Sequence, residues 1–216
     1  MKKTTHLLFI VLFVIGLAAC STPAVTATPS AVTAPEPGFV TFADPVLEAM
    51  VRGSMGKPEG DITLAEAQTV TRMDLDNGWQ QYLPQGTPIQ DISGLESFTN
   101  LESLDLSSQT VADISALQGL VNLTSLSLAG NPVSDISPLA GLTNLKILIL
   151  SDSQAQDYGA LANLVNLQVL LLDNSTITDL TPLASLTNLQ TLYLANSAVD
   201  DLSPLENLYP NLVTKD

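Results

Sequence analysis

Acidic side chains recur along this chain at an interval of 22 residues. The aspartates that share this spacing are Asp91, Asp113, Asp135, Asp157, Asp179 and Asp201. If successive intervals stack as neighbouring strands, their carboxylates lie about 5 Å apart, and such a row of oxygen ligands could hold calcium ions. A calcium loop, however, gathers several carboxylates within one short stretch. We therefore expect no metal site, and expect each aspartate to accept backbone N–H bonds in the turn that it precedes.

The N-terminal segment has the pattern of a cleaved export signal. Two lysines precede an apolar run from Leu7 to Leu17, which is too short to span a bilayer comfortably. The segment closes on a Leu-Ala-Ala-Cys sequence ending at Cys20, which resembles the lipobox of bacterial lipoproteins. The resemblance implies a signal peptide of residues 1–19 and a diacylglycerol on Cys20. An ordinary secretory signal that happens to contain a cysteine is the alternative.

Cleavage of this signal would remove most of the reactive side chains. The only histidine, His6, would leave with the signal, and the only cysteine, Cys20, would carry the lipid. Ser-His-Asp and Cys-His arrangements would then be excluded, as would zinc sites built on histidine or cysteine. No glycine-rich phosphate loop follows a strand. We therefore expect no cofactor, and only carboxylate chemistry remains open for an enzyme.

The charge balance limits the kinds of partner. The sequence has 7 basic and 22 acidic residues, with a formal net charge of -15, and loss of the signal would remove two of the lysines. So acidic a domain is repelled by nucleic acid and by anionic lipid headgroups. We expect no nucleic-acid partner. Membrane attachment is therefore expected only through the diacylglycerol on Cys20. The two acyl chains of this group matter, because a single lipid chain binds weakly.

Composition divides the rest of the chain into three parts. Residues 20–38 contain almost only Ser, Thr, Pro, Ala and Val, and lack a core-forming pattern. Such a composition predicts a disordered tether that holds the folded part away from the membrane. We expect a helical N-terminal cap over residues 39–69 and the repeats over residues 70–216.

From Leu101 onward, a 22-residue sequence returns with its leucines in register. The regular repeats start at Leu101, Leu123, Leu145, Leu167 and Leu189. Each begins with L-x-x-L-x-L, whose alternation predicts a short strand with one buried face. A D-I-S-P-L element follows, in which we expect the Ser or Thr hydroxyl to cap a short 3₁₀ turn that proline favours. No repeat can bury its apolar face alone, so the strands should stack as a parallel sheet.

The second half of each repeat supplies the opposite wall of the core. The apolar residues expected there are, in the second repeat, Val133, Ile136, Leu139 and Leu142. A period in the twenties with this opening is the signature of leucine-rich repeats. The fold class that we predict is therefore an α/β solenoid: a leucine-rich repeat arc with a parallel concave sheet, short 3₁₀ turns on the convex side and a small helical N-terminal cap.

The L-x-x-L-x-L, D-I-S-P-L and L-T-N-L elements together resemble the 22-residue repeats of bacterial internalin-like proteins. The resemblance covers about residues 70–212. It extends to the cap, where Asp44-Pro45 and Thr63 to Glu66 look like two helix starts, the second a capping box with Ile62 as its hydrophobic staple. In internalin-like proteins the concave face recognises partner proteins, so the resemblance implies a protein ligand here.

Two features depart from the internalin-like pattern. The ninth position of that pattern is often an asparagine that bonds the backbone of neighbouring turns. Here the ninth positions are Gln109, Asn131, Ser153, Ser175 and Ser197. Serine should bond locally, but more weakly than asparagine. The third repeat replaces D-I-S-P-L with D-Y-G-A-L from Asp157, which loses the hydroxyl and the proline and predicts a looser turn.

The residues that alternate with the strand leucines should face solvent on the concave side. In the early repeats these residues are small and polar, whereas the later repeats place apolar residues there. The residues that we expect to bind a partner are Ile147, Ile149, Val169, Leu171, Asp173 and Tyr193. An exposed apolar cluster commonly marks an interface, and tyrosine is a favoured anchor. The alternative is that these residue types only favour strand formation.

Both ends of the repeat array are irregular. Residues 76–88 lengthen the first repeat and contain Trp79 and Tyr82, which we expect to pack on the cap rather than to clamp a ligand. The last repeat is followed by a short segment that ends in Lys215 and Asp216. We expect a terminal half-strand there with these residues as gatekeeping charges; a contact surface at this edge is the alternative.

Together these features predict a cell-surface, lipid-anchored module that binds a partner protein and is not an enzyme. Two alternatives remain. One is a passive envelope component without a specific ligand. The other is a carboxylate-based glycan hydrolase, for which Asp105 and Asp173 are the candidate acids on the concave face.

Overall fold

The computed structural model describes residues 38–76, 87–208, 210 and 212–215, and these belong to one compact unit. The predicted signal peptide, Cys20, nearly all of the tether, and the loop with Trp79 and Tyr82 lie outside the described residues. Within the described part, no helix has the length and apolar character needed to cross a membrane.

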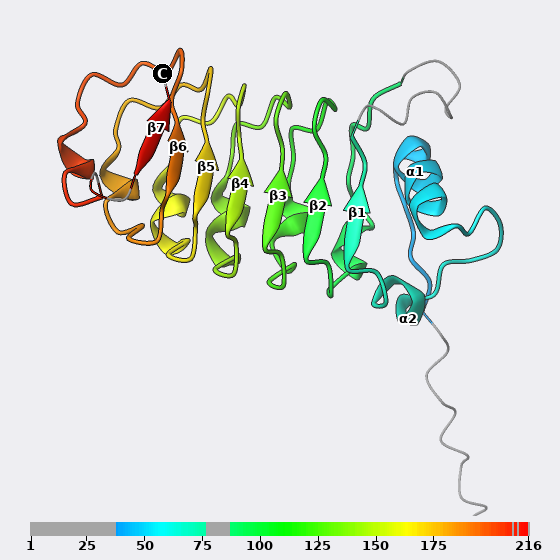
Figure 1. Cartoon of the computed structure of the whole chain (residues 1–216). Coiled ribbons are helices and arrows are strands. Elements are labelled where there is room, and N and C mark those ends of the chain that lie inside the picture. Colours follow the sequence, from blue (N-terminus) through cyan, green and yellow to red (C-terminus); the bar gives the residue numbers. More distant parts are fainter. Residues whose placement is uncertain (1–37, 77–86, 209, 211, 216) are drawn as a thin grey trace, which may run out of the picture. The chain divides into compact units, whose positions relative to one another are not determined.

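Seven strands form a single parallel sheet in sequence order (Figure 1). The strands are β1 (Arg72–Asp74), β2 (Ser103–Asp105), β3 (Ser125–Ser127), β4 (Ile147–Ile149), β5 (Val169–Leu171), β6 (Thr191–Tyr193) and β7 (Val213–Lys215). Equivalent repeat positions pair across neighbouring strands, as in Leu126 with Leu148 and Leu148 with Leu170. The parallel sheet predicted from the leucine alternation is confirmed, and β7 is the terminal strand expected after the last repeat.

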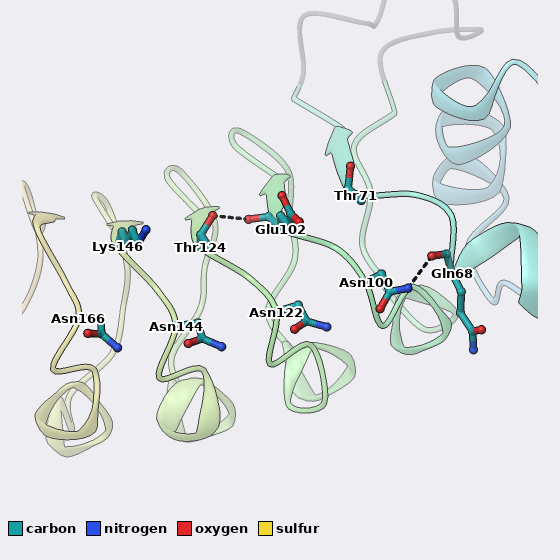
Figure 2. A pocket seen from close by; sticks show the side chains of 9 residues that line it. All are labelled: Gln68, Thr71, Asn100, Glu102, Asn122, Thr124, Asn144, Lys146 and Asn166. Carbon is teal, nitrogen blue, oxygen red and sulfur yellow. Dashed lines mark hydrogen bonds between the residues drawn. The ribbon is translucent and has the colours of Figure 1, made fainter.

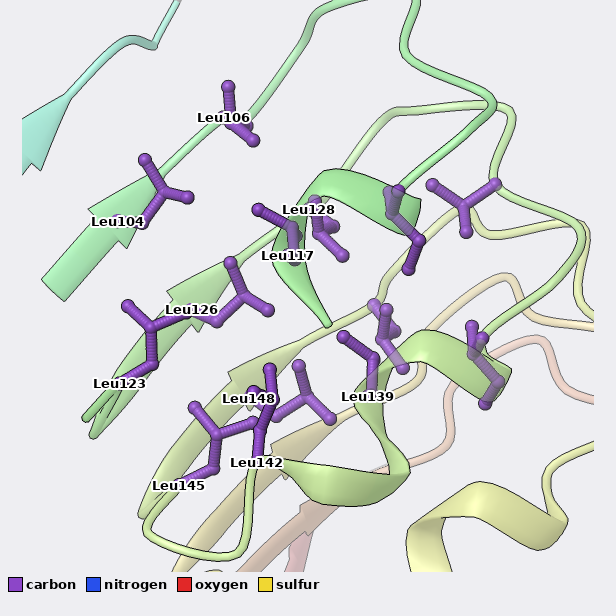
Figure 3. Packing of buried hydrophobic residues seen from close by; sticks show 14 of the residues in the cluster. Leu104, Leu106, Leu117, Leu123, Leu126, Leu128, Leu139, Leu142, Leu145 and Leu148 are labelled. Atoms are coloured by element: carbon purple, nitrogen blue, oxygen red, sulfur yellow. The ribbon is translucent and has the colours of Figure 1, made fainter. Parts of the chain in front are cut away.

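The opposite wall of the repeats consists of short 3₁₀ turns, as predicted. They are η2 (Leu95–Ser97), η3 (Ser115–Leu117), η4 (Ser137–Gly141), η5 (Gly159–Asn163), η6 (Thr181–Leu183) and η7 (Ser203–Leu205). Leucines from the strands and from these turns interdigitate between the two walls (Figure 3). The interior residues assigned from the second repeat are at most 1% exposed: Val133, Ile136, Leu139 and Leu142.

Each turn is capped by its preceding aspartate. In all six repeats the aspartate Oδ1 accepts a bond from the backbone N–H two residues later, with an N–O distance of 2.8 Å. This confirms the prediction that each of the aspartates spaced by 22 residues accepts a backbone N–H bond in the turn that it precedes. The hydroxyl and N–H groups of the residue two positions later also hold the pKa of Asp91, Asp135 and Asp179 below its usual value.

The predicted hydroxyl cap is therefore wrong. No side chain at the N-cap position of η4 or η7 bonds the turn. Ser203 instead lies inside its turn, and its hydroxyl donates to Asp201 Oδ2 at 3.0 Å. The aspartate caps the turn instead, because its carboxylate carries a full charge and makes stronger hydrogen bonds with N–H donors than a hydroxyl does.

The looser turn predicted for the third repeat is also wrong. η5 spans five residues, as η4 does, and Gly159 N–H donates to Asp157 Oδ1 at 2.8 Å. Tyr158 takes the interior position and is only 5% exposed. Since the aspartate makes the capping bond in every repeat, loss of the serine and proline leaves the turn intact.

The ninth positions of the repeats form a buried ladder of polar groups. Asn131 Oδ1 accepts from Val111 N–H at 3.0 Å, and its Nδ2 donates to Leu106 O at 2.8 Å. Gln109 does the same work one repeat earlier, since it accepts from Ile89 N–H and donates to Leu75 O, each at 2.8 Å.

The ladder weakens toward the later repeats. Ser153 Oγ has only a long 3.5 Å contact with the Tyr158 hydroxyl. The Oγ of Ser175 is buried with no hydrogen-bond partner. The weaker bonding expected of serine is confirmed, because its short side chain cannot reach the backbone groups that the amides reach.

The two predicted helix starts of the cap are confirmed. Asp44 caps α1 (Pro45–Met55), where its Oδ1 accepts from Val46 N–H at 2.7 Å. Its Oδ2 accepts from Gln90 N–H at 2.8 Å, which joins the cap to the first repeat. Thr63 and Glu66 form the capping box of α2 (Leu64–Ala67). In Figure 1, α1 lies beside β1 and shields that end of the sheet.

Glu66 makes the stability of the cap dependent on pH. Its carboxylate accepts from Lys57 Nζ at 2.6 Å and from Thr63 N–H at 2.8 Å. The Lys57 bond first, and then the Thr63 bonds, lower the pKa of Glu66 from 4.5 to about 2. A carboxyl whose pKa is lower in the folded chain stabilises that chain above the unfolded pKa, and this stabilisation is lost as pH falls through the folded pKa.

We predict that Glu66→Gln lowers the free energy of unfolding at pH 7. The glutamine keeps an acceptor for the capping box but loses the charge that pairs with Lys57. The difference from the original chain should shrink below pH 4.5 and vanish near pH 2. Urea unfolding at several pH values measures it, with Glu59→Gln at an exposed position of the same segment as the control. A constant difference across this range would contradict the assigned pKa.

Candidate binding surface

The outward side chains of the strands form one surface, which we call the concave face. It consists of the first and third residues of β1 to β6, since the middle residue of each strand points into the core. In β4, for example, Leu148 is fully buried whereas Ile147 is 38% exposed. This alternation places the sequence-predicted residues on the expected side.

Five predicted residues form a contiguous set, which we call the apolar patch. Ile147 lies opposite Val169, and Ile149 lies opposite Leu171, which in turn lies opposite Tyr193. Ile147 is exposed and the other four are half-buried. The structure thus brings these five residues together on β4, β5 and β6, where they can make apolar contacts with a ligand.

Asp173, the sixth predicted residue, lies just beyond the end of β5 at the edge of the patch. It is half-buried, and its Oδ1 accepts from Ala195 N–H at 2.9 Å. That bond ties the loops that follow β5 and β6. One carboxylate oxygen therefore has a structural role, which the sequence interpretation did not foresee.

The early strands give the concave face a different character. Asp74 and Asp105 lie opposite each other on β1 and β2, and Asp105 lies opposite Ser127 on β3. Asp105 Oδ1 accepts from Ser107 N–H at 2.8 Å and from Ser107 Oγ at 2.5 Å. The hydroxyls of Ser107 and Ser127 are 2.6 Å apart. This network fixes the Asp105 carboxylate in one orientation.

The geometry does not support the glycan hydrolase alternative. Asp105 belongs to β2 and Asp173 follows β5, so they lie three strands apart. At about 4.8 Å per strand this is roughly 14 Å, whereas the paired acids of glycosidases lie about 5 to 9.5 Å apart. Among the residues that the structure describes, no group of three or more acidic, histidine or cysteine side chains could hold a metal ion.

A polar groove, which the sequence interpretation missed, follows the edge where the strands begin (Figure 2). Its volume is about 630 Å³, and it lies between the starts of the strands and the turns. One wall contains Glu102, Thr124 and Lys146. The other contains a ladder of exposed asparagines, each donating from Nδ2 to a backbone oxygen of the preceding turn, as Asn122 does to Thr99 O at 2.9 Å.

These asparagines account for the recurring L-T-N-L element. The same bond appears one repeat earlier, from Asn100 to Gln68 O, and one repeat later, from Asn144 to Val121 O. Their 22-residue spacing was a signal that could have revealed them. The side-chain amides donate their hydrogen bonds to the backbone of the preceding turn. The groove is therefore explained by the stacking of the repeats.

Comparison with known proteins supports this architecture. The family model described as "Leucine Rich repeats (2 copies)" matches residues 121–163 and 165–207. The fold is a leucine-rich repeat solenoid. No curated protein matches the sequence.

Solved structures of internalins are similar to this chain. An internalin of Listeria monocytogenes, InlF, is 29% identical with a TM-score of 0.68; the match covers 84% of this chain and 58% of InlF. Internalin C2 of the same organism is 28% identical with a TM-score of 0.57, and the match covers 82% of this chain and 94% of that protein. This chain therefore spans little more than half of the first of these internalins and nearly all of the second.

A more distant solenoid shares the fold alone. It is a plant peptide hormone receptor solved in complex with the peptide RGF2. This receptor is 21% identical with a TM-score of 0.56, and the match covers 68% of this chain and 24% of the receptor.

Proposed function

We propose that this leucine-rich repeat chain is an exported, lipid-anchored protein that binds a partner protein on its concave face. The observation that carries the proposal is the apolar patch, a set of in-register apolar side chains on β4 to β6 that are exposed or half-buried. Contiguous exposed apolar surface is uncommon on proteins that bind nothing. The similarity to internalins supports a binding role.

Rigid complementarity is the proposed mechanism. Every strand of β2 to β6 is held on both sides by its neighbours, so the face is formed before the ligand arrives. A preformed surface loses little conformational entropy on docking. The patch has a single aromatic residue, Tyr193, and sugar-binding surfaces usually stack several aromatic rings against the ligand. We therefore favour a protein partner over a glycan.

We predict that Ile149→Asp combined with Leu171→Asp abolishes binding. Two carboxylates at the centre of the patch would have to lose their hydration on docking, which costs several kcal/mol and weakens binding by at least about a hundredfold. The chain would be immobilised and used to capture proteins from cell envelopes and culture supernatants. Bound proteins would be identified by mass spectrometry.

The matched control is Val121→Asp combined with Val165→Asp. These valines are 49% and 44% exposed and lie away from the concave face, so the substitution adds the same charge elsewhere. A partner retained by this control and lost by the patch variant would support the proposal. Equal capture by both variants would refute the site, and no capture by any chain would favour the passive envelope component.

The anchor is proposed from the lipobox-like sequence that ends at Cys20. The acylated cysteine would be the new N-terminus, followed by the tether of residues 21–38 and then the folded repeats. Mass spectrometry of the N-terminal peptide tests this directly, because diacylglycerol on Cys20 adds a defined mass. An unmodified peptide that begins at another residue would contradict the anchor.

A further inference from the structure

The order of side chains along one row of the concave face indicates the chemistry of the ligand; this inference rests on the proposed function. The row consists of in-register third residues of successive strands: Asp74, Asp105, Ser127, Ile149, Leu171 and Tyr193. It passes from two acids through one hydroxyl to three apolar or aromatic side chains. We call it the graded row.

The acidic end of the row carries an uncompensated like-charge pair. Asp74 and Asp105 face each other on neighbouring strands, and like charges directly opposite one another destabilise a sheet. In the described part of the chain, neither carboxylate has an ion pair. Arg72 shares their face but pairs with neither. A cation supplied by a ligand would remove this repulsion.

Asp105 is also prepared to accept a donor. Its Oδ1 is held by the N–H and hydroxyl of Ser107, and Ser107 is held in turn by Ser127. Its Oδ2 has no hydrogen-bond partner among the described residues. A carboxylate fixed in this way accepts a charged donor without losing further side-chain freedom.

The spacing of the row matches an extended peptide lying across the strands. Neighbouring strands are about 4.8 Å apart, and alternate residues of an extended chain are about 6.7 Å apart. A residue centred between Asp74 and Asp105 therefore places the second residue after it over Ser127. The fourth residue lies between Ile149 and Leu171, and the sixth lies close to Tyr193. All four of these ligand side chains point to the same side of the peptide, as period-two alternation requires.

We propose that the graded row binds an extended segment of a partner protein with a basic residue at one end, a small residue two positions away, and apolar residues four and six positions away. The basic side chain bridges Asp74 and Asp105. The apolar side chains cover Ile149, Leu171 and Tyr193. The strongly negative chain attracts such a basic segment over long range.

The test uses the full chain in mild detergent and two fluorescent seven-residue peptides of identical composition. In the ordered peptide, lysine is first, serine third, and leucine fifth and seventh, with threonine between them. In the shuffled peptide, lysine and the fifth-position leucine are exchanged, so no chain direction restores the order. Fluorescence anisotropy measures both affinities. We expect the ordered peptide to bind at least about tenfold more tightly.

Charge removal provides the matched variants. Asp74→Asn combined with Asp105→Asn should weaken ordered-peptide binding by about tenfold while leaving the chain folded, since the substitution removes a repulsion. Glu59→Gln combined with Glu206→Gln removes the same charge from exposed positions off the concave face and should leave the affinity unchanged. Ile149→Asp combined with Leu171→Asp should abolish binding.

The two proposals fail in different ways. Equal affinity for both peptides, no binding of either, or an unchanged affinity after Asp74→Asn and Asp105→Asn would each overturn the graded row as a peptide site. None of these results would affect a partner protein captured through the apolar patch. Loss of the proposed function would appear instead as equal capture by the patch variant and its valine control.

Discussion

Replacement of Asn131 with alanine is expected to lower the free energy of unfolding by about 3 kcal/mol. The side chain is 1% exposed and bonds the backbone of two repeats, through Val111 N–H on one side and Leu106 O and Leu128 O on the other. Alanine would leave these backbone groups buried without partners, and each such group costs about 1 to 3 kcal/mol. Urea unfolding followed by circular dichroism measures the loss.

Asn122→Ala is the matched control for that experiment. Asn122 precedes the same repeat, but it is exposed, and its Nδ2 donates a hydrogen bond to Thr99 O at 2.9 Å. Water can replace this partner, so the expected loss is about 0.5 to 1 kcal/mol. Similar losses for the two variants would mean that burial of the Asn131 amide contributes little.

Leu148→Ala is expected to cost about 2 to 5 kcal/mol. Leu148 is the buried middle residue of β4, the central strand of the sheet, and it pairs with Leu126 and Leu170. Truncation leaves a cavity between neighbouring repeats. In a solenoid, stability depends on the interfaces between adjacent repeats, so this cavity weakens the coupling between the two halves.

The neighbouring residue provides the control. Ile147→Ala removes a side chain of the same volume that is 38% exposed on the concave face, and it should cost below about 1 kcal/mol. If Leu148→Ala uncouples the two halves of the solenoid, each half should also unfold in its own transition. Urea unfolding followed by circular dichroism would then show two separate steps. A single coincident transition would show that the halves stay coupled.

The strands and the buried positions of the repeats were predictable because the same leucine pattern recurs in every repeat. Strand position and burial follow from leucine alternation, and a stack of equivalent repeats has one consistent register. Capping of the turns was less predictable, because a serine before a proline and an aspartate two residues earlier can both cap. Only the geometry shows that Asp135 reaches Ser137 N–H while the hydroxyl does not cap.

The eighth position of the repeats was missed for a related reason. Ser108, Gly130, Asp152, Asn174 and Asn196 all have positive φ, between 56 and 68 degrees. Only one of them is glycine, so glycine does not recur at this position in a way that would have indicated a left-handed residue. Aspartate and asparagine adopt this conformation more readily than most other residues because their short polar side chains bond locally. The mixture of residue types was the only available signal.

The candidate site was predictable in part. The apolar patch follows from the same alternation as the core. The pairing of Asp74 with Asp105 could not be predicted from the sequence. These two residues are 31 positions apart, whereas equivalent positions of the regular repeats are 22 apart. The insertion hid the register of β1, so the acidic end of the graded row required the three-dimensional pairing.

The constant register of β2 to β6 has a genetic consequence. A recombination event that gains or loses one 22-residue unit would add or remove one strand without turning any side chain from one wall to the other. The distance between the acidic pair and the apolar patch would then change in steps of about 4.8 Å. Such events would give descendants of this gene a molecular ruler, in which ligand length is altered by copy number while every individual repeat stays unchanged.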